Sequence, residues 1–140
     1  MKLFKHSCSA LLISVASTIA FADTSIIVSA SNPNSTLDQT TVSKIFLGKA
    51  KRFPDGSQAL PVDQDEGSAV RDAFNSSVLG KSDSQLKSYW SRLIFTGKGT
   101  PPKPSGDDAA VKDLVAKNPN IIGYIDSSAV DASVKVVHTF

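Results

Sequence analysis

Short apolar runs, each about the length of one strand, alternate along the chain with stretches that have helical spacing. The strand-like runs begin at Ser25, Leu60, Ile121 and Val134. Helical patterns separate the first three runs, so the predicted order is strand, helix, strand, three helices and two strands. Strands separated by helices usually cross over to lie parallel in one sheet. The sequence therefore predicts an α/β fold with a small, mostly parallel sheet and helices on both of its faces.

Capping residues mark the predicted starts of the four helices, which are Thr36, Ser68, Ser82 and either Asp107 or Asp108. Both Thr36 and Ser82 are followed three residues later by glutamine, which is the spacing of a capping box. The third helix has the clearest amphipathic pattern, with apolar residues at intervals of three and four: Leu86, Tyr89, Trp90, Leu93 and Ile94. This face is predicted to pack in the core, with Trp90 as a core residue rather than as a platform for a ligand.

The first 22 residues have the pattern of a secretory signal peptide. Lys2 and Lys5 give a basic start, an apolar segment follows, and Ala20-Phe21-Ala22 matches the small-residue cleavage pattern. Residues 23–140 are then expected to form one exported domain of 118 residues (140 less 22) in a bacterial periplasm. No other stretch approaches the ~20 apolar residues of a membrane-spanning helix, so membrane insertion is not expected.

Cys8 is the only cysteine and lies within the predicted signal. The mature domain is therefore expected to have no disulfide and no cysteine-based metal site, which suits a periplasmic domain better than a small disulfide-stapled one. Without Lys2 and Lys5, the 15 basic residues fall to 13 and balance the 13 acidic ones. No basic stripe remains, so nucleic-acid binding is not predicted.

The turn before the second predicted helix is the candidate binding site. Gly67 lets the chain turn and Ser68 caps the helix. The N–H groups of Ala69, Val70 and Arg71 then point out of a helix N-terminus at the end of a strand. Such a terminus, with the helix dipole behind it, is suited to binding an anion, and the Arg71 guanidinium could add a charged contact to an oxyanion. The alternative interpretation is a plain capped helix.

No residues have the spacing of a catalytic or metal-binding motif. Asp63, Asp65 and Glu66 crowd one turn, where they either hold a cation or, as we favour, stay solvated and stabilise the helix N-terminus that follows. His138 is the only histidine after the signal, and the spacing supplies neither the acid nor the oxyanion hole that a Ser68–His138 pair would need. We therefore predict a non-enzymatic protein without a metal or cofactor.

Four segments resemble, in the same order, the motifs of one protein family. Leu37 to Gly48 resembles a helix that ends I-F-x-G, and Glu66 to Phe74 resembles a strand-to-helix turn, D-G-S-G-T, with a phenylalanine six residues after the serine. Trp90 to Gly97 and Ile122 to Tyr124 resemble the later motifs W-s-r-l-I-F-T-G and I-G-Y. The family is that of the phosphate-binding, periplasmic substrate-binding proteins of ABC transporters, in particular its short stand-alone members.

Full-length members of this family consist of two α/β lobes that hold phosphate between them, and this chain resembles one lobe of that type 2 periplasmic-binding-protein fold. The family's S-G-T is Ser68-Ala69-Val70 here, and Gln64 replaces an arginine four residues before the serine. Gln64 would then donate as a neutral group, with Arg71 as the replacement cation. The resemblance and the turn together indicate these ligand-binding residues: Gln64, Gly67, Ser68, Ala69, Val70 and Arg71.

The resemblance implies that the protein binds inorganic phosphate or a similar oxyanion and serves an ABC transporter. The alternative is an interaction or sensor module, in which a single lobe has lost tight ligand binding and docks on a membrane transporter or sensor. A homodimer, in which two copies rebuild a cleft, is a further expectation that the sequence leaves open.

Overall fold

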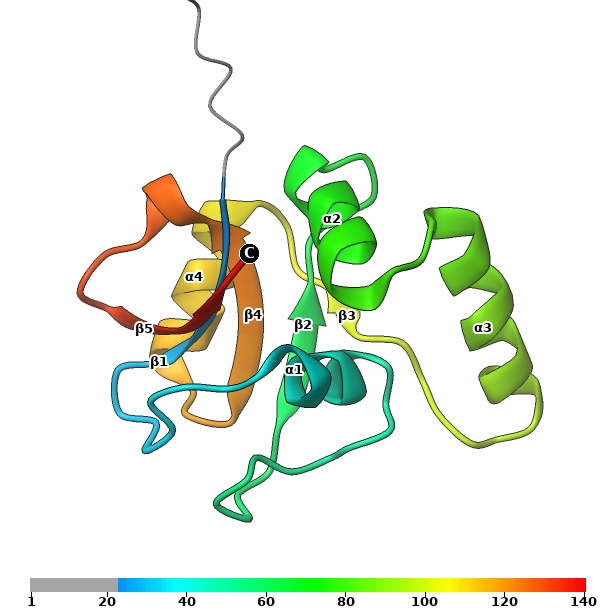
Figure 1. The fold of residues 1–140 in the computed structure, drawn as a ribbon, viewed down its shortest axis with the longest axis horizontal. Coiled ribbons are helices and arrows are strands. Elements are labelled where there is room, and N and C mark those ends of the chain that lie inside the picture. The colour runs from blue at the N-terminus through cyan, green and yellow to red at the C-terminus, as the bar shows by residue number, and fades with distance from the viewer. Residues whose placement is uncertain (1–22) are drawn as a thin grey trace, which may run out of the picture.

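The structure, a computed structural model, describes residues 23–140, and the predicted signal peptide lies outside the described residues. Within these residues, five strands form one sheet in the order β3-β2-β4-β1-β5 (Figure 1). The strands are β1 (Thr24–Ser29), β2 (Leu60–Asp63), β3 (Lys103–Pro104), β4 (Ile121–Asp126) and β5 (Val134–Thr139). β2 lies parallel to β3 and β4, whereas β1 is antiparallel to its neighbours β4 and β5. The sheet is therefore mostly parallel, as predicted, with β1 running against the other four strands.

Helices cover both faces of this sheet, which confirms the predicted α/β architecture (Figure 1). One face is covered by α1 (Gln39–Phe46), α2 (Ala69–Phe74) and a π-helical turn, η1 (Asn75–Leu79), that continues α2 without a break. The other face is covered by α4 (Asp108–Lys117). The longest helix, α3 (Asp83–Phe95), stands to one side of the sheet, and a 3-10 turn, η2 (Ser127–Ala129), follows β4.

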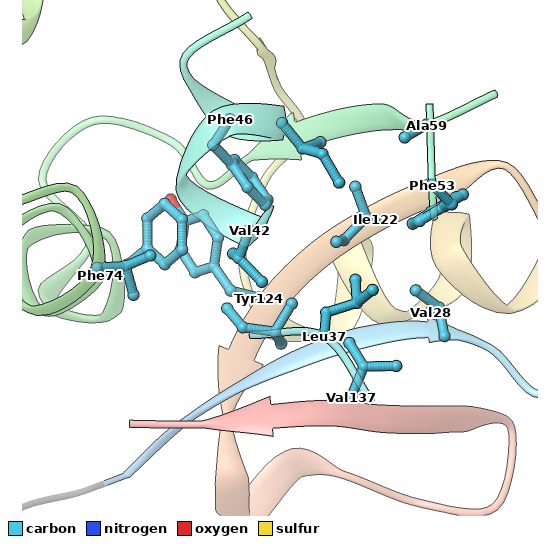
Figure 2. Close-up of a cluster of buried hydrophobic side chains, with 13 residues drawn as sticks. Val28, Leu37, Val42, Phe46, Phe53, Ala59, Phe74, Ile122, Tyr124 and Val137 are labelled. Atoms are coloured by element: carbon cyan, nitrogen blue, oxygen red, sulfur yellow. The ribbon is translucent and has the colours of Figure 1, made fainter. Parts of the chain in front are cut away.

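The larger core cluster lies between the sheet and the α1 and α2 helices (Figure 2). The Phe74 ring stacks on the Tyr124 ring with 3.9 Å between centroids, and Phe46 meets Phe74 edge-on at 4.7 Å. Ile26 of β1 points into this cluster, whereas its neighbour Ile27 points to the α4 face, because side chains alternate across a strand. The buried strands thus supply apolar side chains to both helical layers, as expected for a sheet covered on both faces.

A glycine allows α4 to pack closely on β4. Val111 and Val115 of α4 are fully buried against the sheet. A Cβ atom on Gly123 would lie 2.7 Å from Val111 Cγ1 and 3.2 Å from Val115 Cγ2. Because carbon atoms cannot approach to 2.7 Å without repulsion, this helix position depends on the absence of a side chain at Gly123.

The predicted start of α1 is wrong. Asp38 is the N-cap, and its carboxylate accepts a hydrogen bond from the Thr41 N–H at 2.7 Å. Thr36 lies outside the helix, because the neighbouring Leu37 N–H bonds to the Val137 carbonyl of β5 at 2.9 Å and keeps this segment beside the sheet. A long-range backbone contact therefore overrides the local capping-box spacing.

The other predicted helix starts are confirmed, with N-caps at Ser68, Ser82 and Asp107. Ser82 and Gln85 form the expected capping box. The short strand β3 was not predicted, because it lies in a proline-rich segment. Proline is tolerated there because β3 is the edge strand of the sheet.

The apolar face of α3 is only partly buried. Trp90 is 9% exposed and packs with Leu86 and Leu47 in a cluster of its own, apart from the two that flank the sheet. Ile94 is 55% exposed, so the prediction that this whole face packs in the core is wrong for Ile94. Within residues 23–140, no helix is both long enough and apolar enough to cross a membrane.

Candidate functional site

The turn from β2 into α2 has the predicted N-cap. Ser68 Oγ accepts a hydrogen bond from the Arg71 N–H at 3.2 Å, and Gly67 has a φ of +88°, a conformation that glycine adopts without strain. The Ser68 hydroxyl also donates to Gln64 Oε1 at 2.6 Å. Protein groups therefore already satisfy the hydroxyl that the sequence assigned to a ligand.

Gln64 joins the N-termini of two helices. Its buried side chain donates from Nε2 to Asp108 Oδ1 of α4 at 2.6 Å and to the Tyr124 carbonyl at 3.1 Å, while Oε1 accepts from Ser68 at the start of α2. An amide NH₂ has two hydrogens, and both are used in these contacts. Gln64 thus holds the site together rather than presenting a free donor to a ligand.

The donors left at the N-terminus of α2 are backbone groups. Among residues 23–140, the N–H groups of Ala69 and Val70 make no hydrogen bond, as expected for the first turn of a helix. Val70, Ser68 and Gln64 border a shallow hollow of about 300 Å³. The remaining lining residues of this hollow are Asp65, Glu66, Gly106, Asp107 and Asp108.

Carboxylates dominate the charge of this hollow. Four of them line it, and among the described residues no lysine or arginine does. Asp107 caps α4 by accepting from the Ala110 N–H at 3.0 Å, and Asp65 accepts from the Gly106 N–H at 3.0 Å. These contacts stabilise the two helix N-termini, but the same negative charges repel an incoming anion.

The Arg71 side chain extends away from the hollow. Its Nη1 donates to the Gln64 carbonyl at 2.9 Å, and its Nη2 lies 3.7 Å from Asp63 Oδ2 and 3.8 Å from Asp83 Oδ1. The guanidinium lines a separate cavity, between α2 and α3. The structure thus brings Gln64, Ser68 and Val70 together at the hollow but places the Arg71 charge elsewhere.

Asp63 and Tyr124 form a partly buried polar pair behind the turn, which the sequence analysis missed. The Tyr124 hydroxyl donates to the Asp63 carboxylate, and the Gln64 N–H donates to both side chains. Burial raises the pKa of Asp63, although the Tyr124 hydrogen bond and the Arg71 charge lower it in part. Burial and the nearby Asp63 charge raise the pKa of Tyr124. The sequence could have indicated this pair, because Tyr124 lies within an apolar strand and a buried tyrosine hydroxyl needs a hydrogen-bond partner.

Ser68 and His138 have separate partners in the structure. Ser68 is bonded to Gln64, whereas His138 Nδ1 lies 2.8 Å from the Leu37 carbonyl oxygen, so the two side chains do not pair. Among residues 23–140, no group of three or more His, Cys, Asp or Glu side chains is placed to hold a metal ion.

The N-termini of α2 and α4 meet beside Gln64, which bonds to the start of each. In open α/β sheets, ligands bind where strands end and helices begin. The hollow lies at such a place, after β2 and beside the N-terminus of α4.

Several solved structures share this fold. A candidate phosphate ABC transporter substrate-binding protein from Clostridium perfringens, with bound phosphate, matches 83% of this chain with a TM-score of 0.67 and 27% identity. An ABC-type phosphate transport receptor from Vibrio cholerae matches 84% with a TM-score of 0.65 and 21% identity, and PstS from Borrelia burgdorferi matches 84% with a TM-score of 0.60 and 12% identity. The sequence matches no protein-family model and no curated protein.

These neighbours confirm the resemblance seen in the sequence at the level of the fold: the described residues share the fold of part of several phosphate ABC transporter substrate-binding proteins, consistent with a single lobe. The chain spans less than half of the length of these structures, namely 45%, 46% and 47% of the three chains. The neighbours are named as binding and transport proteins, not as enzymes.

Proposed function

We propose that this chain is a non-enzymatic, periplasmic binding protein that holds inorganic phosphate or a similar oxyanion at the N-terminus of α2 and serves an ABC transporter. The observation that carries the proposal is the pair of unbonded N–H groups of Ala69 and Val70 in the first turn of α2. The phosphate bound by the Clostridium perfringens neighbour, which shares the fold at 27% identity, supports this choice of ligand.

The surrounding residues act as a frame for these two donors. Gly67 makes the turn, and Gln64 and Ser68 fix the start of α2 against α4. Because α2 continues directly into η1, the helical segment behind the donors runs from residue 69 to residue 79 and directs its dipole toward the hollow.

Binding should be weak in the described lobe. The hollow is shallow and lined by four carboxylates, so water competes for each donor and the carboxylate charges oppose the anion. We expect a dissociation constant on the order of 10 µM to 1 mM for phosphate, unless a second lobe or a partner closes over the ligand.

A phosphate titration followed by amide chemical shifts tests the site directly. The largest shifts should cluster at Gly67 to Val70. Ser68→Ala should loosen the frame and weaken binding by about 0.5–1.5 kcal/mol. The matched control is Ser82→Ala, which removes the N-cap of α3, far from the hollow along the chain, and should leave phosphate binding unchanged. If no shifts appear at millimolar phosphate, the oxyanion proposal fails.

The carboxylates of the hollow provide a second, opposite test. Glu66→Gln removes one negative charge from the lining, so phosphate should bind more tightly, by about twofold for one exposed charge. Asp113→Asn removes the same charge from the exposed surface of α4 and serves as the control. Equal affinities of the two variants would show that phosphate does not bind in this hollow.

The periplasmic location rests on the predicted signal peptide. The protein recovered from the periplasm should begin at or near Asp23, which follows the Ala20-Phe21-Ala22 pattern. Mass spectrometry that found an intact Met1 would contradict this part of the proposal.

A docking lobe is the second candidate function, and the exposed end of α3 favours it. Phe95 is 92% exposed and its neighbour Ile94 is 55% exposed, so two large apolar side chains adjoin on the surface. We take a second copy of the chain as the partner that covers this surface, because this can be tested with the purified protein alone. Sedimentation equilibrium should then show a dimer that Phe95→Ser dissociates, whereas a monomer at all concentrations would exclude this version.

A further inference from the structure

A cavity of about 440 Å³ lies between α2 and η1 on one side and α3 on the other. This volume is within the range of sites for small organic molecules, roughly 300–1,000 Å³. Its apolar wall includes Phe74 of α2, Trp90 and Ile94 of α3, and Pro102 before β3. The cavity and the hollow at the start of α2 are separate, with Glu66 at the border of both.

Asn75 presents an unsatisfied polar group to this cavity. The residue is 4% exposed and lines the cavity, and no hydrogen bond joins its side-chain amide to another group within residues 23–140. Buried amide groups are almost always hydrogen-bonded in folded proteins, because leaving them unpaired is unfavourable. The Asn75 carboxamide has no partner within the described residues and borders the cavity, so it is free to bond a group that enters there.

Arg71 adds a second donor at the same cavity. Its Nη2 lies 3.7 Å from Asp63 and 3.8 Å from Asp83, and both distances exceed that of a hydrogen bond. The buried Arg71 Nε also lacks a hydrogen-bond partner among the described residues. The guanidinium is thus neutralised by the two carboxylates but retains Nη2 hydrogens that can donate to an acceptor.

The charges around the cavity favour a neutral ligand. Asp63, Glu66 and Asp83 supply three negative charges, and Arg71 and Lys87 supply two positive ones. The opposite charges nearly balance, so neither an anion nor a cation gains much net attraction from the lining. The donors and the apolar wall therefore fit a neutral molecule that carries a hydrogen-bond acceptor.

We propose that this cavity binds a neutral, apolar small molecule with an amide or ester carbonyl. The carbonyl oxygen accepts hydrogen bonds from Asn75 Nδ2 and Arg71 Nη2, and the apolar part of the ligand packs against Trp90 and Ile94. This site is independent of the oxyanion hollow.

The only tryptophan of the chain, Trp90, lines the cavity and reports binding through its fluorescence. The probes are N-acetyl-phenylalaninamide, which is neutral, N-acetyl-phenylalanine, which is an anion, and phenethylamine, which is a cation. The neutral amide should give a saturable change, and both charged probes should bind at least about tenfold more weakly. Equal responses to the three probes, or no saturable response to the amide, would overturn the proposal.

Variants of two kinds locate the probe. Asn75→Leu keeps the approximate size of the side chain but removes its donor, and it should weaken the amide probe by about tenfold. Ser91→Phe should fill part of the cavity and weaken binding, whereas Ser88→Phe makes the same change on α3 outside the cavity lining and should not. If Ser88→Phe and Ser91→Phe have the same affinity, the probe binds elsewhere.

The two proposed sites can fail separately. Saturating phosphate should neither displace the amide probe nor change Trp90 fluorescence, because the hollow and the cavity are separate. Competition between phosphate and the amide probe would show that the cavity is not a site of its own. A chain that binds the amide probe but not phosphate would retain this inference and lose the oxyanion proposal.

Discussion

The α3 and α4 helices have similar amphipathic sequences but very different partners. α4 buries Val111 and Val115 completely against the central strands, where Gly123 leaves room for them. α3 buries Leu86 and Trp90 against the end of α1, while other residues of its apolar face line a cavity or are exposed. Apolar spacing thus indicates which face of a helix avoids water, but not whether a sheet, another helix or a ligand covers it.

The comparison also separates the two candidate sites. The hollow beside the start of α4 is polar, and its side-chain donors are satisfied within the protein. The cavity beside α3 is largely apolar and retains an unpaired amide on Asn75. A helix that packs tightly on the sheet leaves little space for a ligand, whereas a helix held by a small separate cluster can border a cavity.

The largest effect is expected from Trp90→Ala, which removes the main contact of α3. We expect a loss of about 3 kcal/mol in the free energy of unfolding, the lower end for such a change, because Trp90 borders a cavity. Amide exchange should show that α3 loses protection while α4 keeps it. Phe95→Ala, on the same helix but 92% exposed, is the control and should be nearly neutral. Equal losses of protection in α3 and α4 would contradict the difference between the helices.

Gly123→Ala tests the close packing of α4. The new Cβ would lie 2.7 Å from Val111 Cγ1, so β4 and α4 must separate, and we expect a loss of about 2 kcal/mol. Gly99→Ala is the control beside α3, because its Cβ would meet Trp90 at an ordinary 3.7 Å. Denaturant unfolding should show little change, about 0.5 kcal/mol, for the control. A larger loss of stability for Gly99→Ala than for Gly123→Ala would contradict the conclusion that α4 packs more tightly than α3.

Tyr89→Phe should have a smaller effect, confined to α3. The Tyr89 hydroxyl donates to the Leu47 carbonyl at 2.6 Å, and this bond ties α3 to the end of α1. Its loss should cost about 1 kcal/mol, measured by denaturant unfolding. Unchanged stability would mean that apolar contacts alone hold α3 in place.

Asp63→Asn should change the pH dependence of stability, since Asp63 lines the cavity beside α3. Burial raises the pKa of Asp63 in the folded protein above the ordinary value of 3.8. Protonation of Asp63 therefore stabilises the folded protein. This stabilisation is complete below the pKa of the unfolded state and is lost as the pH rises through the pKa of the folded state. Relative to Asp63→Asn, the parent protein should gain stability as the pH falls from neutral toward the ordinary carboxyl pKa of 3.8. A difference in the free energy of unfolding that is constant with pH would contradict the raised pKa.

The sequence by itself determined the features that depend on near neighbours in the chain. Alternating apolar runs and helical patterns predicted the α/β fold, and the cap at Ser68 was predicted from a turn of a few residues. The resemblance to phosphate-binding proteins could be seen for the same reason, since each of its segments is short and continuous.

Only the tertiary structure decided the features that depend on residues far apart in the sequence. The bond between Leu37 and Val137 moved the start of α1, and the position of α3 left Ile94 exposed. Gln64 was predicted as a ligand donor, but its hydrogens are used by Asp108 and Tyr124, which lie 44 and 60 residues away. Whether a polar group is free for a ligand depends on what the fold places around it, because a buried donor bonds to the first acceptor that packing brings within reach.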